Sequence, residues 1–203
     1  MTLVRLLDLM GIGVFAVSGA LAAGRKRLDL LGVFVLASVT AIGGGTVRDL
    51  LLDRPIVWLT DVAYLAVIVF SVMVTFLYVQ WRRPPLASLL VADALGLALF
   101  SVGGAQIAEH ANLPAVSVVL LGTVTGVGGG VIRDVLSAEI PFVLRRGNLY
   151  ASTVIFGVAV YLLLESVGVA TQLASLTGMA LIAAIRLAAI RWELMLPVFE
   201  VDE

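Results

Sequence analysis

The chain contains the stretch Ile42-Gly43-Gly44-Gly45-Thr46-Val47-Arg48-Asp49-Leu50-Leu51, which returns as Val127-Gly128-Gly129-Gly130-Val131-Ile132-Arg133-Asp134-Val135-Leu136. The offset between the two copies is 85 residues. The same offset aligns Asp8, Gly11, Phe15, Val17, Gly19, Ala20, Ser38 and Thr40 with Asp93, Gly96, Phe100, Val102, Gly104, Ala105, Thr123 and Thr125. Separated blocks that share one offset indicate an internal repeat.

The composition around this repeat is that of a polytopic membrane protein. Of 203 residues, 61% are hydrophobic and only 13% are charged, and the mean hydropathy is +1.12. A soluble domain of this size could not hide so much apolar surface. This excludes a cytosolic enzyme and a disordered chain, and the net charge of −1 gives no basic surface for nucleic acid. Without cysteine, and with His110 as the single histidine, no zinc site is expected.

Charged residues divide the chain into seven apolar segments, and a helix needs about 20 apolar residues to cross a bilayer. The predicted spans are 9–24, 30–47, 62–81, 94–108, 111–132, 147–164 and 166–185. The connections are too short for a soluble domain. We therefore predict an all-α protein with one transmembrane domain, 1–203, made of repeat one (about 5–82), repeat two (about 86–166) and a seventh helix (about 167–192).

Each repeat holds three spans, which is an odd number, so the second copy enters the membrane upside down. This 3+3 inverted plan is common among transporters, where interrupted helices in corresponding positions mark the pathway. Basic residues predict the orientation. One face receives Arg25, Lys26, Arg27, Arg82, Arg83, Arg145, Arg146, Arg186 and Arg191, against Arg5 and Arg54 on the other. The N-terminus is therefore expected outside and the C-terminus in the cytoplasm.

The triple glycines in spans two and five have two interpretations. One is close helix packing, because small residues let backbones approach in lipid. The other is a kink or break, since glycine disfavours helix by roughly 1 kcal/mol relative to alanine. A break would free backbone carbonyls that can coordinate a cation. Four hydroxyl groups near the glycines would add oxygens to the lining of such a pathway; they belong to Ser38, Thr40, Thr123 and Thr125.

Charged residues follow the glycines in both copies, as Arg48-Asp49 and Arg133-Asp134. Charges near span ends can be interfacial anchors, but charges inside a membrane usually face a bundle interior or a pathway. The inverted arrangement places Asp8 near Arg48 at the outer side. It places Asp93 near Arg133 at the cytoplasmic side. We expect each aspartate to pair with its arginine and the two pairs to line or gate the two mouths of one pathway.

Seven spans, the 3+3 repeat and the doubled Gly-Gly-Gly-x-x-Arg-Asp motif resemble the trimeric intracellular cation (TRIC) channels, in particular their prokaryotic members. These share a domain known as a putative glycine transporter. The resemblance implies a homotrimer in the inner membrane, with a potassium-selective pore in each protomer around kinked spans two and five. Gly43, Gly44, Gly45, Gly128, Gly129 and Gly130 would be the kink positions. Potassium is then a permeant ion, and no cofactor or enzymatic activity is expected.

Two further functions compete with a channel. In a secondary transporter of a small amino acid, the same helix breaks would form an occluded site near the midplane. A structural scaffold would leave the doubled motif unexplained.

The resemblance implies a trimer, and small residues on spans one and four predict its contact surface, because helices that associate in lipid must approach closely. Gly19 and Gly104 are its expected central positions.

Overall fold

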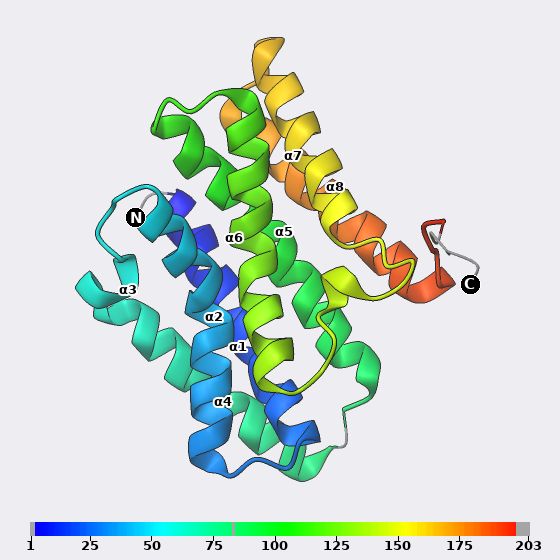
Figure 1. Ribbon diagram of the computed structural model, residues 1–203. Helices are drawn as coiled ribbons and strands as arrows, with labels where there is room; N and C mark the ends of the chain where they lie inside the picture. The colour runs from blue at the N-terminus through cyan, green and yellow to red at the C-terminus, as the bar shows by residue number, and fades with distance from the viewer. Residues whose placement is uncertain (1–2, 83, 198–203) are drawn as a thin grey trace, which may run out of the picture.

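The computed structural model describes residues 3–82 and 84–197, so Arg83 and the acidic tail 200–203 lie outside the described residues. Seven helices form the body of the protein (Figure 1). They are α1 (Leu3–Arg25), α2 (Leu30–Leu51), α4 (Val62–Trp81), α5 (Leu86–His110), α6 (Ala115–Leu136), α7 (Ala151–Ser166) and α8 (Thr171–Trp192). A short helix, α3 (Val57–Thr60), precedes α4, and a 3₁₀ turn, η1 (Phe142–Leu144), follows α6.

Six of the helices in the described ranges are long and apolar enough to cross a membrane: α1, α2, α4, α5, α6 and α8. The protein is therefore an integral membrane protein. The sixth predicted span is realised as α7, which has 16 residues. At about 1.5 Å per residue this helix is roughly 24 Å long, short of the roughly 30 Å hydrocarbon core. The count of seven full spans thus stays a prediction.

The interior is built around α1 and α5, which cross with a reciprocal aromatic contact. The rings of Phe15 and Phe100 stack with their centroids 5.3 Å apart. Each ring lies over a glycine of the opposite helix: a Cβ at Gly96 would be 2.6 Å from Phe15, and one at Gly11 would be 3.0 Å from Phe100. Glycine is needed at Gly96 because any side chain there would overlap the ring.

Structural details recur at the 85-residue offset of the sequence repeat. Left-handed residues end helices at Arg27 and Asp53 in the first half and at Asn112 and Ala138 in the second. In both halves, the aspartate after the arginine accepts a hydrogen bond from the first residue of the next turn: Val57 N to Asp49 Oδ2 (3.4 Å) and Phe142 N to Asp134 Oδ2 (2.9 Å). In Figure 1, α2 and α6 lie side by side and run in opposite directions.

The triple glycines form the crossing of α2 and α6. Both helices continue through them without interruption, so the expected break is absent, and a kink there stays a prediction. A Cβ at Gly44 would stand 2.0 Å from the Thr125 carbonyl oxygen, and one at Gly129 would stand 2.2 Å from that of Thr40. These distances leave no room for any side chain. Close packing, the first of the two interpretations, is what the glycines provide here.

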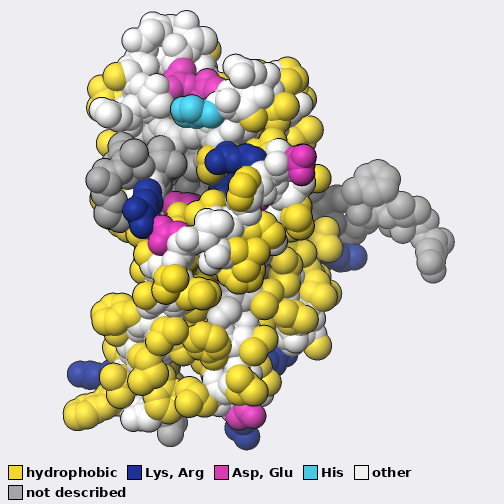
Figure 2. All heavy atoms as spheres, turned by 90° about the vertical axis from the view of Figure 1, so that its left-hand side faces the viewer, with side chains coloured by type: hydrophobic (Ala, Val, Ile, Leu, Met, Phe, Trp, Pro, Cys, Tyr) yellow, Lys and Arg dark blue, Asp and Glu magenta, His cyan; other side chains and the backbone are white. Residues whose placement is uncertain are grey.

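The outer surface suits a lipid environment. Figure 2 shows charged side chains gathered in the upper part and at the lower edge of one face, with a hydrophobic belt between them. Large apolar side chains are exposed on α2 and α4, among them Leu31 (71%) and Phe70 (70%). In water such a surface would drive aggregation, whereas in a bilayer it contacts lipid tails.

Candidate functional site

The hydroxyl groups expected to line a pathway are engaged within their own helices. Each donates to the carbonyl four residues earlier: Ser38 to Phe34, Thr40 to Leu36, Thr123 to Val119 and Thr125 to Leu121. Thr40 and Thr125 are fully buried beside the glycine crossing. A lining role for these four residues stays a prediction, since conduction would require the crossing to open.

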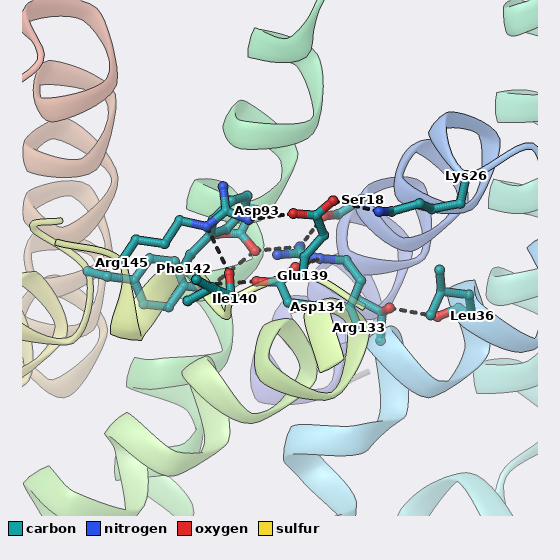
Figure 3. Close-up of polar contacts among 12 residues, drawn as sticks. Ser18, Lys26, Leu36, Asp93, Arg133, Asp134, Glu139, Ile140, Phe142 and Arg145 are labelled. Carbon is teal, nitrogen blue, oxygen red and sulfur yellow. Dashed lines mark hydrogen bonds and ion pairs between the residues drawn. The ribbon is translucent and has the colours of Figure 1, made fainter. Parts of the chain in front are cut away.

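Arg133 near the C-terminal end of α6 is the centre of a buried polar cluster (Figure 3). Its Nη1 donates to Asp93 Oδ1 on α5 and to Ser18 Oγ on α1, each at 2.6 Å. Its Nε donates to Asp134 Oδ1 at 2.8 Å. Both Arg133 and Asp93 are 0% exposed. The predicted pair of Asp93 with Arg133 is therefore confirmed, and it joins three helices.

Two aromatic side chains enclose this cluster. The Tyr150 hydroxyl donates to Asp93 Oδ1 at 3.2 Å, and the guanidinium of Arg133 lies 4.9 Å from the centre of the Phe142 ring. The low dielectric of a buried site makes each of these contacts stronger than at a surface. Among the residues that the structure describes, no group hydrogen-bonds Asp93 Oδ2 or Arg133 Nη2. With two carboxylates for one guanidinium, the cluster holds a formal excess of negative charge.

Arg48 near the C-terminal end of α2 makes a simpler cluster. It bonds Asp49 Oδ1 at 2.9 Å, and its Nη1 has no hydrogen-bond partner in the described part of the chain. Asp8 instead accepts a hydrogen bond from the Tyr64 hydroxyl at 2.8 Å. The predicted pair of Asp8 with Arg48 is wrong as a direct contact: no ion pair joins them within the described residues.

A difference between the halves explains the unequal clusters. Ser18, which holds Arg133, is replaced at the equivalent position of the other half by Gly103, so Arg48 lacks a hydroxyl partner. Asp8 and Arg48 both line a cavity of about 20 Å³. That volume is enough for about one water molecule, which could bridge the two charges.

A larger cavity of about 150 Å³ lies beside the Arg133 cluster, lined by Asp134, Ser137, Phe142 and the charged residues Arg25, Lys26, Glu139 and Arg145. Lys26 Nζ donates to Glu139 Oε1 at 2.5 Å across this cavity, from the end of α1 to the loop after α6. This bond and the positive charge of Lys26 lower the pKa of Glu139 below its usual range. Because charged side chains form much of its lining, we call this cavity the vestibule.

The two clusters stand at opposite ends of the glycine crossing, because α2 and α6 are antiparallel and each arginine follows its glycines. Within the described residues, no three His, Cys, Asp or Glu side chains are grouped so as to hold a metal ion. Four features therefore follow one another along α2 and α6: the small cavity at Asp8 and Arg48, the glycine crossing, the buried Arg133–Asp93 pair and the vestibule. We call this series the polar axis.

Three findings could not be anticipated from the sequence. Gly19 and Gly104 are buried within the chain: a Cβ at Gly19 would be 2.7 Å from Ala37 Cα, and one at Gly104 would be 2.6 Å from Thr125 Cβ. This corrects their assignment to a contact between protomers. Arg186, expected at the cytoplasmic face, is only 1% exposed. Tyr150 reaches Asp93 although no motif singled it out.

Two antiparallel helices, α2 and α6, cross at their triple glycines between two buried charge clusters. This architecture is that of an integral membrane protein with polar groups along its interior. The family model described as "Glycine transporter" matches residues 5–80 and 90–166. The chain belongs to this family, which includes the prokaryotic TRIC channels.

Relatives of known sequence cover nearly the whole chain. The UPF0126 inner membrane protein YadS of Escherichia coli is 47% identical over 204 residues, 99% of this chain and 98% of that protein. A UPF0126 membrane protein of Vibrio cholerae is 46% identical over 98% of this chain and 83% of its own length.

Solved structures agree with this assignment. The TRIC channel orthologue from Rhodobacter sphaeroides has a TM-score of 0.90 at 36% identity, with 96% of this chain and 100% of that chain covered. A second structure, described under "Structural basis for conductance through TRIC cation channels", has a TM-score of 0.87 at 34% identity and covers both chains completely.

Proposed function

We propose that this protein is a cation channel that conducts monovalent cations, chiefly potassium, through a pore in each protomer of a homotrimer. The observation that carries the proposal is the full-length likeness to TRIC cation channels, with a TM-score of 0.90 at 36% identity. The same likeness supports a channel rather than an enzyme. The trimer rests on the same likeness.

The conformation described above is a closed one under this proposal. The glycine crossing leaves no open path between α2 and α6, and the Arg133–Asp93 pair with Ser18 ties α1, α5 and α6 together next to the vestibule. Opening would separate these helices and draw Arg133 away from its carboxylates. Asp93 and Asp134 would then face the path and favour cations over anions by simple attraction.

The orientation follows from the basic residues and is part of the proposal. The vestibule residues Arg25, Lys26 and Arg145 would lie at the cytoplasmic side, in accord with the positive-inside rule. The Asp8 and Arg48 cavity would then lie at the outer side, with the N-terminus.

The deciding experiment records currents from the purified protein in planar bilayers under a potassium chloride gradient. We expect unitary current steps that reverse near the potassium equilibrium potential. Gly44→Ala should change the open probability of these steps, because no side chain fits in the closed crossing and α2 and α6 would have to move apart. Gly45→Ala is the matched control, since its Cβ would be 3.6 Å from the nearest atom. Native mass spectrometry in mild detergent tests the trimer, and a monomer would contradict it.

A secondary transporter of a small amino acid is the second candidate, and the name of the family, "Glycine transporter", favours it. An inverted repeat suits this function as well as it suits a channel. Proteoliposomes discriminate between the two candidates: saturable glycine counterflow without unitary currents would replace the channel proposal with the transporter.

A further inference from the structure

Arg186 of α8 is a buried cation outside the two glycine motifs. It is 1% exposed, and its Nη1 donates to Asn148 Oδ1 at 2.9 Å and to the Leu149 carbonyl at 2.7 Å. Its guanidinium lies 4.7 Å from the centre of the Tyr150 ring. Within the described residues no carboxylate lies at ion-pair distance from it, so two carbonyl oxygens and a ring face are its direct contacts, and Asp93 attracts its charge from farther away.

Such a charge is expensive in a low-dielectric interior. An arginine within a membrane-spanning helix is unfavourable unless its donors are satisfied, and among the described residues Nε of Arg186 has no hydrogen-bond partner. One nitrogen of the guanidinium, Nη1, donates both hydrogen bonds to the loop, while the group as a whole lies against the Tyr150 ring. All of these contacts of Arg186 are therefore made to the loop before α7, at residues 148–150.

That loop leads directly to the buried ion pair. The Tyr150 ring carries Arg186 on its face, and its hydroxyl donates to Asp93 Oδ1 at 3.2 Å. Asp93 in turn accepts from Arg133 at 2.6 Å. The same hydroxyl lies against the second glycine motif, since a Cβ at Gly130 would be 2.8 Å from it. Arg186 is thus linked to both the ion pair and the crossing through one tyrosine.

The segment that follows α8 holds the loop as well. Leu196 N donates to the Gly147 carbonyl at 2.8 Å, and Met195 forms an antiparallel bridge with Asn148. The backbone before Tyr150 is therefore fixed by contacts from α8 and from the residues after it. Little freedom remains for the tyrosine ring.

We propose that Arg186 is a positioning residue of the gate: by holding Tyr150 against Asp93, α8 stabilises the closed arrangement of the Arg133–Asp93 pair. This inference rests on the proposed channel function and deepens it, because it gives the helix outside the repeat a role in gating. Arg186 does not touch the path itself. It acts through the orientation of the tyrosine hydroxyl.

The test is the open probability of single channels in planar bilayers. Arg186→Met and Tyr150→Phe should each raise the ratio of open to closed time roughly fivefold, as expected for loss of one hydrogen bond from the closed state. The double variant should show no further rise, since both changes break the same link. Arg191→Gln is the matched control, an exposed arginine on the same helix that should leave the ratio unchanged.

The outcomes separate gating from folding. A merely structural role for Arg186 would reduce the number of channels and leave the open probability of each unchanged. Unchanged or lower open probability in Arg186→Met overturns the inference. If Arg186→Met does not assemble, Tyr150→Phe decides in the same way, because it keeps the ring and removes only the hydroxyl. Absence of unitary currents in the unaltered protein would instead refute the proposed function.

Discussion

Adding one methyl group at Gly44 should destabilise the protein, whereas adding it one residue later should not. In Gly44→Ala the new Cβ would lie 2.0 Å from the Thr125 carbonyl oxygen, a backbone atom that cannot rotate away. An unstrained carbon–oxygen contact is about 3.3–3.6 Å. The α2–α6 crossing would therefore have to widen locally by roughly 1.3 Å, measured from this lower limit. Overpacking of this kind is unfavourable by about 1–3 kcal/mol.

Gly45→Ala gives the matched comparison because its Cβ would have ordinary contact, 3.6 Å from Arg48 Nη2. It should be neutral or stabilising by up to about 1 kcal/mol, the helix preference of alanine over glycine in water. Thermal unfolding of both variants in one detergent, followed by circular dichroism, measures the difference. Equal stability of the two variants would refute the tight crossing and favour a more open arrangement of α2 and α6.

Three further predictions concern the charges. Arg133→Gln should destabilise the protein by about 3–5 kcal/mol, because it leaves Asp93 and Asp134 buried without their arginine. Asp93→Asn should destabilise it less, because Arg133 keeps its ion pair with Asp134. A double-mutant cycle on unfolding should give non-additive effects for Asp93 and Arg133, and additive effects would contradict the contact. The pKa of Glu139 is lowered by Lys26, so any stabilisation from their bond should be present at neutral pH and be lost as the pH falls through that lowered pKa. Lys26→Met should return the pKa of Glu139, measured by NMR, toward its usual range. An unchanged pKa would show that the bond is absent. Because the chain has no cysteine, Ser137→Cys gives a single thiol on the vestibule wall. A small water-soluble thiol reagent should modify this thiol faster in variants with raised open probability. Equal modification rates would show that the vestibule does not widen when the channel opens.

Several features of the fold follow from the sequence alone. The spacing of charges predicted helices at the positions of α1, α2, α4, α5, α6, α7 and α8, because a bilayer requires long uncharged segments. The repeat offset predicted which residues would be equivalent. The Asp93–Arg133 pair could be inferred because both residues lie near the same end of neighbouring spans, where burial makes an unpaired charge costly.

The same reasoning failed for Asp8 and Arg48, and the reason is local. Equivalent positions predict equivalent contacts only where the surrounding residues are also equivalent, and Gly103 in place of Ser18 removes one partner of the arginine. Each aspartate accepts from a tyrosine, Asp8 from Tyr64 and Asp93 from Tyr150, but only Asp93 also reaches its arginine. A repeat in sequence therefore specified where the charges lie but not which groups they would contact.

The sequence by itself determined a membrane protein of two homologous halves, because hydropathy and repetition are properties of the chain read in order. It could not decide whether the triple glycines interrupt a helix or let two helices touch, since both uses require the same residue. Only the tertiary structure decided this, by placing the carbonyl oxygens of Thr40 and Thr125 against Gly129 and Gly44. It also decided that Arg186 turns inward to Tyr150, because the position of a side chain on an appended helix depends on packing between segments far apart in the chain.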